Sequence, residues 1–384
     1  MSLDTVAATQ PTFREAFPAI DRTTYLASCS LGARSDRLDA ALTTMLDEMA
    51  EFGAPWDRFE QRVALVRRQF AALIGAQPEQ IAIMPNASVG AFQAVSSLEL
   101  GRRDRIVTCA AEFPSIAQVW LAQQARGAAV VFVDEPGLDP LGADYVKALD
   151  HRTALVSVPL VTYRTAVRPP VTDIVAAARA AGAVTFVDAY QGAGIAPVDV
   201  DRLGCDFLVA GTSKYLLGLP GLAFLYVREP AAARREPLLT GWFGRRDPFS
   251  FDPRRLDFPA EARRYETGTP PVPAIYAGTA GLALLGTVSQ ATVAAHVGHL
   301  VDTAIQRLTS DGHRVHADVE PSRRGAHVAL LVDDPARLTR DLASDQVIVS
   351  PRGDVVRVAF HYYNNQDDID RLIRSLHRHR SAGR

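Results

Sequence analysis

Cysteine is scarce in this sequence, which has only Cys29, Cys109 and Cys205 among 384 residues. Three widely spaced thiols argue against a disulfide framework and against a cysteine-based zinc site. The nearby histidines of the C-terminal third have no third ligand at a recognisable spacing, so no metal site is predicted.

Long hydrophobic runs and a strong net charge are also missing. No run approaches the length of a membrane span, and the N-terminus lacks the basic-then-apolar pattern of a secretory signal. We therefore expect a cytoplasmic protein. The net charge of −2 gives no general attraction for nucleic acid or an anionic membrane, so neither is expected as a partner.

The composition that remains is typical of a globular protein, with 48% hydrophobic and 22% charged residues. Apolar strand-like runs alternate with helical patterns between residues 81 and 210, which favours a doubly wound, mainly parallel sheet. The length allows two domains. We predict a large α/β domain over residues 45–262 and a smaller α+β domain formed by residues 1–44 with 263–384.

The second half of the chain shows a different pattern. A long helical stretch is predicted from about Ala274 to Leu308, followed by strands over 325–333 and 354–360. A final helix begins at about Gln366. These segments form the predicted smaller layer.

Two polar residues stand at the ends of predicted buried strands. Asp188 follows the apolar run 183–187, and Lys214 comes just after the run 206–210. Ligands of open α/β sheets bind at the carboxyl ends of the strands. The alternative is an ordinary buried ion pair and a surface lysine.

Pyridoxal phosphate chemistry needs this pair of residues. A lysine forms an imine with the cofactor aldehyde. An acid that keeps the pyridine nitrogen protonated lets the ring act as an electron sink. Lys214 and Asp188 are therefore the candidate catalytic residues.

Other segments could complete such a site. The turn Asn86-Ala87-Ser88 lies between a short strand and a helix, where free amides and the positive helix end suit a phosphate. An ordinary helix cap is the alternative there. Phe113 could stack on a flat cofactor or belong to the core, and Ser30 could contact substrate or lie in a plain loop.

These motifs together resemble the class V aminotransferase-like enzymes, which are pyridoxal phosphate proteins with the aspartate aminotransferase type of fold. The similarity covers nearly the whole chain. Its core is Asp188-Ala-Tyr-Gln191 with Ser213-Lys214-Tyr-Leu-Leu-Gly. Tyr163-Arg-Thr, Gly241-Trp-Phe-Gly and the segment around Phe113 look most like kynureninase.

The resemblance implies a role for each matching residue. Lys214 would hold the cofactor and move the α-proton, which requires its pKa to fall from about 10.4. Asp188 would pair with the pyridinium and Arg357 with the substrate carboxylate. The resemblance also implies a homodimer whose active site is shared between subunits. The implied cofactor contacts are Ala87, Ser88, Phe113, Thr162, Asp188, Gln191, Ser213, Lys214, Trp242 and, from a second subunit, Thr269.

The sequence departs from kynureninase at several of these positions. Gln191 and Arg245 stand where kynureninases usually have histidine, and Thr162 replaces an asparagine. No cysteine lies in the loop before Arg357, so cysteine desulfurase chemistry has no obvious nucleophile.

We therefore expect a pyridoxal phosphate enzyme that acts at the α or β carbon of a small amino acid, as a transferase or lyase. Kynureninase-type hydrolysis is the alternative. A nicotinamide-dependent oxidoreductase is disfavoured, because Gly192-Ala-Gly194 lacks the third glycine of the dinucleotide fingerprint. A non-catalytic binding protein that retains the fold is the remaining alternative.

Overall fold

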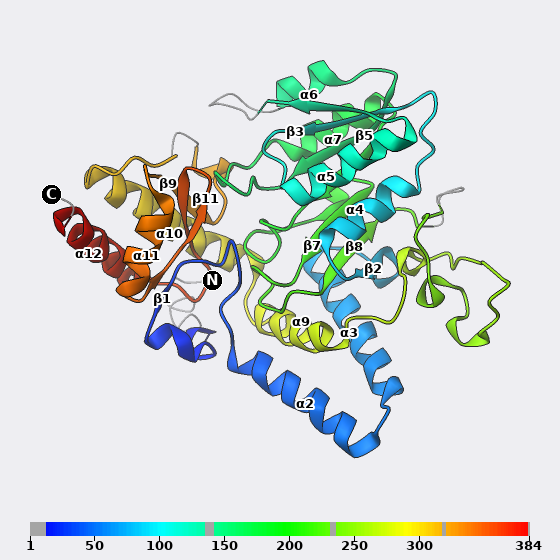
Figure 1. Cartoon of the computed structure of the whole chain (residues 1–384), viewed down its shortest axis with the longest axis horizontal. Coiled ribbons are helices and arrows are strands. Elements are labelled where there is room, and N and C mark those ends of the chain that lie inside the picture. Colours follow the sequence, from blue (N-terminus) through cyan, green and yellow to red (C-terminus); the bar gives the residue numbers. More distant parts are fainter. Residues whose placement is uncertain (1–12, 135–141, 231–235, 317–319, 383–384) are drawn as a thin grey trace.

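The computed structural model describes residues 13–134, 142–230, 236–316 and 320–382. Its elements form a larger α/β unit and a smaller one, which lie side by side (Figure 1). The larger unit holds strands β2 to β8, and the smaller unit holds β1 and β9 to β12. The predicted domain boundaries themselves stay a prediction.

The larger sheet contains seven strands within the described residues, in the order β2-β8-β7-β6-β5-β3-β4. The five strands from β7 to β4 are parallel, whereas β8 is antiparallel to both β7 and β2. The predicted mainly parallel sheet is thus confirmed. The strands are β2 (Ile81–Met84), β3 (Arg105–Cys109), β4 (Ala129–Val133), β5 (Thr153–Pro159), β6 (Val184–Asp188), β7 (Phe207–Gly211) and β8 (Ala223–Val227).

Helices cover both faces of this sheet, because successive strand residues point to opposite sides. Phe186 belongs to the core beneath α4 and α5, while its neighbour Val187 belongs to the core beneath α3 and α7. The helices of this unit are α2 (Asp36–Phe52), α3 (Trp56–Ile74), α4 (Ala87–Ser96), α5 (Pro114–Ala122), α6 (Gly142–Ala148), α7 (Val171–Ala180) and α8 (Val200–Leu203).

The smaller unit is built around two short sheets. Strands β11, β12 and β9 form an antiparallel sheet, and β1 pairs in parallel with β10. The N-terminal strand therefore joins the C-terminal part of the chain. The strands are β1 (Thr24–Tyr25), β9 (His327–Leu331), β10 (Val347–Ile348), β11 (Ser350–Arg352) and β12 (Val355–Ala359), with helices α11 (Pro335–Ser344) and α12 (Gln366–Ala382).

One helix prediction is wrong in its continuity. The stretch from 274 to 308 forms two helices, α9 (Val272–Leu285) and α10 (Gln290–Ser310), which are bent by 83°. Gly286 ends α9, and the side chain of Ser289 accepts a hydrogen bond from the amide of Thr292 to begin α10. A capping serine inside an apolar pattern thus divides the helix.

Within the described residues, no single helix is long and apolar enough to cross a membrane, and α9 with α10 reach that composition only as this bent pair.

Candidate functional site

A cavity of about 270 Å³ lies at the carboxyl ends of the parallel strands. The strand register brings Pro159, Asp188 and Val209 side by side at this edge. Residues of the large unit and of β11 in the smaller unit line the cavity. Its lining residues are Ser30, Asn86, Ala87, Ser88, Phe113, Ser115, Ile116, Pro159, Val161, Tyr163, Asp188, Tyr190, Gln191, Lys214 and Arg352.

Lys214 and Asp188 both line this cavity. The amine Nζ of Lys214 lies 4.6 Å from the ring centre of Tyr190 and 5.2 Å from that of Phe113. One carboxylate oxygen of Asp188 accepts a hydrogen bond from the Tyr190 amide at 2.9 Å. The structure therefore brings together the acid, the amine and the aromatic ring that the sequence singled out.

Burial shifts both groups toward their neutral forms. It lowers the pKa of Lys214 to about 8, although Asp188 opposes the shift. It also raises the pKa of Asp188, against the effects of the Tyr190 amide and the Lys214 charge. An amine with this pKa has an appreciable neutral fraction near neutral pH, which a nucleophile requires.

Tyr190 fixes the wall next to the lysine. Its hydroxyl shares a hydrogen bond of 2.9 Å with the hydroxyl of Ser213. Its ring lies so close to Gly211 that a β-carbon there would be only 2.2 Å from ring atoms. Only glycine therefore fits at the end of β7, directly before the Thr212-Ser213-Lys214 turn.

The first turn of α4 opens onto the cavity through Ala87 and Ser88. Asn86 is the N-cap, because its side-chain oxygen accepts a hydrogen bond from the amide of Val89 at 3.0 Å. The amides of Ala87 and Ser88 have no partner within the helix. The capping and anion-binding interpretations thus coexist at this helix start.

A phosphate-bearing aromatic cofactor fits this set of residues. The amide oxygen of Gln191 is buried without a partner, while its amide nitrogen donates to the carbonyl of Cys29 at 3.0 Å. A ring hydroxyl could satisfy that oxygen. Phe113 supplies a flat apolar wall, and the start of α4 supplies amides for a phosphate.

Two predicted contacts lie behind the cavity wall. Arg357 is 1% exposed and donates hydrogen bonds of 2.8 Å to the carbonyl of Tyr163 and the hydroxyl of Ser350. Thr162 is buried, and its hydroxyl binds Thr165 and the amide of Val167. Neither residue lines the cavity, so both assigned roles stay predictions.

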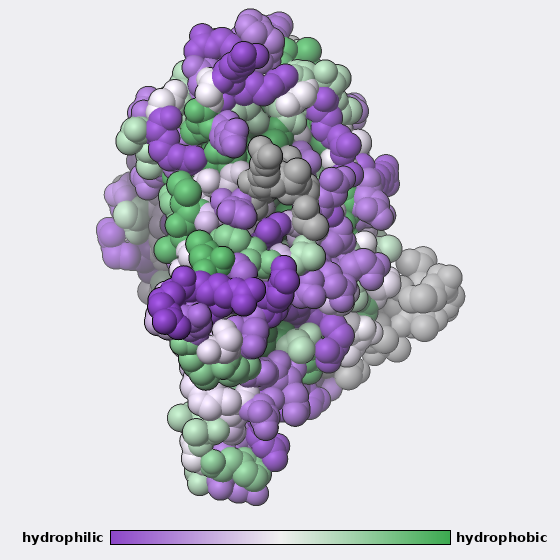
Figure 2. Space-filling view, turned by 90° about the vertical axis from the view of Figure 1, so that its right-hand side faces the viewer, coloured by the Kyte–Doolittle hydropathy of each residue, from purple (hydrophilic) through white to green (hydrophobic). Residues whose placement is uncertain are grey.

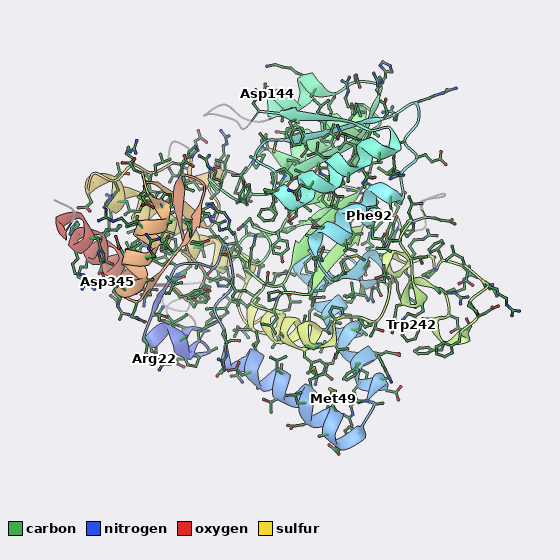
Figure 3. All side chains as sticks on the ribbon, viewed as in Figure 1. Arg22, Met49, Phe92, Asp144, Trp242 and Asp345 are labelled. Carbon is green, nitrogen blue, oxygen red and sulfur yellow. The ribbon has the colours of Figure 1, made fainter. Side chains whose placement is uncertain are left out.

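Trp242 and Thr269 are also absent from the cavity lining. Trp242 lies near the right-hand edge of the molecule in Figure 3, in a separate hollow with Phe251. The phosphate contact assigned to Trp242 therefore stays a prediction, as does that of Thr269, which is expected from a second subunit. Ser213 is buried and held by Tyr190, whereas Ser30 lines the cavity as predicted for a substrate contact.

Sequence reasoning missed several residues of the site. Tyr190 follows Asp188 by two positions and could have been found from that spacing. Arg352 comes from a short hairpin strand with no periodic signal. Glu112, next to Phe113, is buried, and its carboxyl group accepts a hydrogen bond of 2.9 Å from the hydroxyl of Ser157. Burial and nearby Asp188 raise the pKa of Glu112 well above its ordinary range.

Two alternative binding sites, another hollow and the glycine turn at Gly194, do not have the residues that their chemistry would need. A larger hollow of about 610 Å³ between α2, α3 and α9 has no lysine or carboxylate in its lining. Gly194 has a φ of +93°, and a β-carbon there would meet the carbonyl of Tyr215 at 2.6 Å. Backbone conformation and packing therefore account for this glycine without a dinucleotide.

Comparisons with known proteins agree with this geometry. The model of the family "Aminotransferase class-V" matches residues 48–372. The "Uncharacterized aminotransferase YcbU" of Bacillus subtilis (strain 168) is 33% identical over 364 residues, which cover 94% of this chain and 95% of that protein. The kynureninase of Deinococcus radiodurans is 33% identical over 298 residues, which cover 74% of this chain and 70% of that protein.

Solved structures share the fold at lower identity. A mutant of C-DES with glycine covalently linked to its PLP cofactor has a TM-score of 0.88 and 22% identity, covering 94% of this chain and 98% of that chain. The apo cysteine desulfurase of Thermococcus onnurineus NA1 has a TM-score of 0.83 and 21% identity, covering 95% and 96%.

Proposed function

Because the chain belongs to the aminotransferase class-V family, we propose that this pyridoxal phosphate-dependent enzyme acts at the α or β carbon of an amino acid, as a transferase or lyase. One observation carries the proposal: Lys214, Asp188 and Phe113 meet in one cavity that also receives the start of α4.

Each of these residues has a distinct task in the proposal. Bound pyridoxal phosphate supplies an electron sink for charge that develops on the substrate carbon. The carboxylate of Asp188 stabilises positive charge on the ring nitrogen, and Gln191 orients the ring through its free amide oxygen. The amides of Ala87 and Ser88 hold the phosphate.

Lys214 is the residue that would hold the cofactor, and its amine would move a proton at the substrate carbon. Burial keeps its amine partly neutral, so it can accept that proton near neutral pH. Tyr190 and Phe113 restrict where the amine can move, because their rings stand within 5.2 Å of Nζ. Arg357 remains the proposed partner of the substrate α-carboxylate.

Kynureninase-type hydrolysis is the second candidate function. The 33% identity to the kynureninase of Deinococcus radiodurans favours this function. The presence of Gln191 and Arg245 in place of the histidines usual in kynureninases argues against it. Incubation with kynurenine and with simple amino acids distinguishes the candidates. Alanine released from kynurenine supports hydrolysis, whereas amino transfer to a 2-oxo acid, or release of pyruvate and ammonia, supports the leading proposal.

We also propose a homodimer located in the cytoplasm. Exposed apolar side chains support a dimer: Figure 2 shows hydrophobic residues at the lower tip, where Figure 1 places the turn between α2 and α3. The large apolar residues exposed there are Leu46, Met49, Phe52 and Trp56. None of the three cysteines, which all lie among the described residues, forms a disulfide bond, and all are buried, which fits a reducing compartment.

The chain allows a sharp test of the cofactor linkage, because it contains only two lysines, Lys147 and Lys214. The purified protein should show an absorption band near about 420 nm that borohydride abolishes. Peptide mass spectrometry should then find the reduced cofactor on Lys214. Lys214→Ala should lose the band and all turnover, and Lys147→Ala should keep both, because the Lys147 side chain is 77% exposed. Label on Lys147 alone would refute the assignment.

A further inference from the structure

The cavity contains an arginine that the proposed chemistry does not use. Arg352 ends β11 and lines the cavity opposite the large sheet. Its hydrogen bond goes to the carbonyl of the preceding Pro351 at 2.9 Å. Among the described residues, no carboxylate lies within ion-pair distance of its guanidinium.

A second arginine lies close by. The strand register places Arg357 opposite Ser350 on the neighbouring strand. Burial and the charge of Arg357 together lower the pKa of Arg352. The charges of both arginines act on the Lys214 amine, Arg352 from the cavity lining and Arg357 from behind the cavity wall. Such an arrangement is unfavourable until an anion joins it.

The acids nearby do not supply that anion. Asp188 accepts the Tyr190 amide and serves the ring nitrogen in the proposed function. The raised pKa of Glu112 keeps that carboxyl largely protonated at neutral pH. By contrast, Arg164 does have an acid partner, since it contacts Asp354 at 2.5 Å. Arg352 is therefore distinguished by facing the cavity without one.

We propose that Arg352 binds an anionic group on the substrate side chain, so that the enzyme prefers amino acids with a side-chain carboxylate. The inference rests on the proposed function, in which Arg357 takes the α-carboxylate. A guanidinium can bind a carboxylate through two parallel hydrogen bonds, which a neutral amide cannot reproduce. Ser30 and Tyr163, which line the same cavity, provide further donors for such a group.

Paired ligands test this preference in the holoenzyme. L-aspartate and L-glutamate are compared with L-asparagine and L-glutamine by calorimetric titration and by the change in the cofactor absorption band. The wild type should bind the acids about 10- to 100-fold more tightly than the amides, as expected for a charged hydrogen-bonded pair. Arg352→Gln should reduce this ratio to about threefold or less and change the amide affinities little.

Two further variants complete the design. Arg357→Gln should weaken all four ligands, and Arg22→Gln, at an exposed position, should leave all affinities unchanged. A wild type with a normal absorption band and no preference for acids overturns the inference while leaving the proposed function intact. If Arg352→Gln weakens acids and amides equally, Arg352 binds the α-carboxylate and the inference is wrong. A missing band refutes the proposed function itself.

Discussion

Lys214 combines two conditions that oppose each other, since it is enclosed by aromatic rings and lies near a carboxylate. Burial disfavours the ammonium, whereas Asp188 favours it. Burial is the larger effect, and it lowers the pKa from 10.5 to about 8. The folded cofactor-free protein therefore binds fewer protons than the unfolded chain between these two pH values.

We predict a pH-dependent gain in the stability of the cofactor-free enzyme. Below pH 8 the lysine is charged in both states, and its burial penalty is fully present. As the pH rises from about 8 to 10.5 the penalty disappears, on the order of 3 kcal/mol at 1.36 kcal/mol per pKa unit. Denaturant unfolding of the wild type and of Lys214→Met should show their difference rising across this window. A constant difference would contradict the shifted pKa.

The candidate site was predictable where one residue carries the chemistry. Asp188 directly follows one buried run and Lys214 lies just past another, and parallel strands place such positions at one edge. Arg352 could not be found this way, because its place depends on how the β11–β12 hairpin packs against the large sheet. The environment of Glu112 likewise comes from Ser157, 45 positions away in the chain.

At the scale of elements, the start of α4 serves both the helix and the cavity. Asn86→Ala should remove the cap and cost about 1 kcal/mol. It should also weaken cofactor binding, because the amides of Ala87 and Ser88 lose their fixed direction. Ser35→Ala is the control, because Ser35 is the equivalent cap of α2. Its hydroxyl accepts a hydrogen bond from the Leu38 amide at 3.1 Å. Unfolding and cofactor titration should show a similar stability loss for both variants and weaker cofactor binding for Asn86→Ala alone.

The end of β7 should tolerate no side chain. Gly211→Ala forces Tyr190 to move and should destabilise the protein by about 1–3 kcal/mol through overpacking. It should also lower cofactor occupancy, because Tyr190 holds Ser213 beside Lys214. Gly101→Ala is the matched control, since nothing lies within 4 Å of a β-carbon there. Equal melting temperatures and cofactor content for the two variants would show that Tyr190 yields freely.

Most elements were predictable because their hydrophobic periods are clear. The strands near 183–187 and 206–210 and the helix near 57–73 correspond to β6, β7 and α3 within a few residues. The break between α9 and α10 was not found. Apolar residues continue across it, and the local cap at Ser289 outweighed the pattern.

At the scale of the whole molecule, residues implied in cofactor binding lie in separate places. Trp242 and Thr269 do not line the cavity of the described chain. The resemblance places Thr269 in a second subunit, and we propose that the homodimer brings Trp242 to the cavity in the same way. Mixing two inactive variants tests this arrangement. Lys214→Ala and Thr269→Asp proteins, unfolded and refolded together, should recover up to about a quarter of wild-type activity, because half of the random dimers carry one intact site. No recovery would contradict a shared site.

The pairing of β1 with β10 has a consequence for biosynthesis. Thr24 and Val347 are partners although more than three hundred positions separate them, and the loop after β1 packs on the lysine segment through the bond from the Gly32 amide to the Ser213 carbonyl. While the ribosome is still making the chain, residues 24–32 have no strand to join. We therefore expect cofactor loading to wait until translation is nearly finished, because a truncated nascent chain would leave its reactive lysine in an open, unfinished cleft.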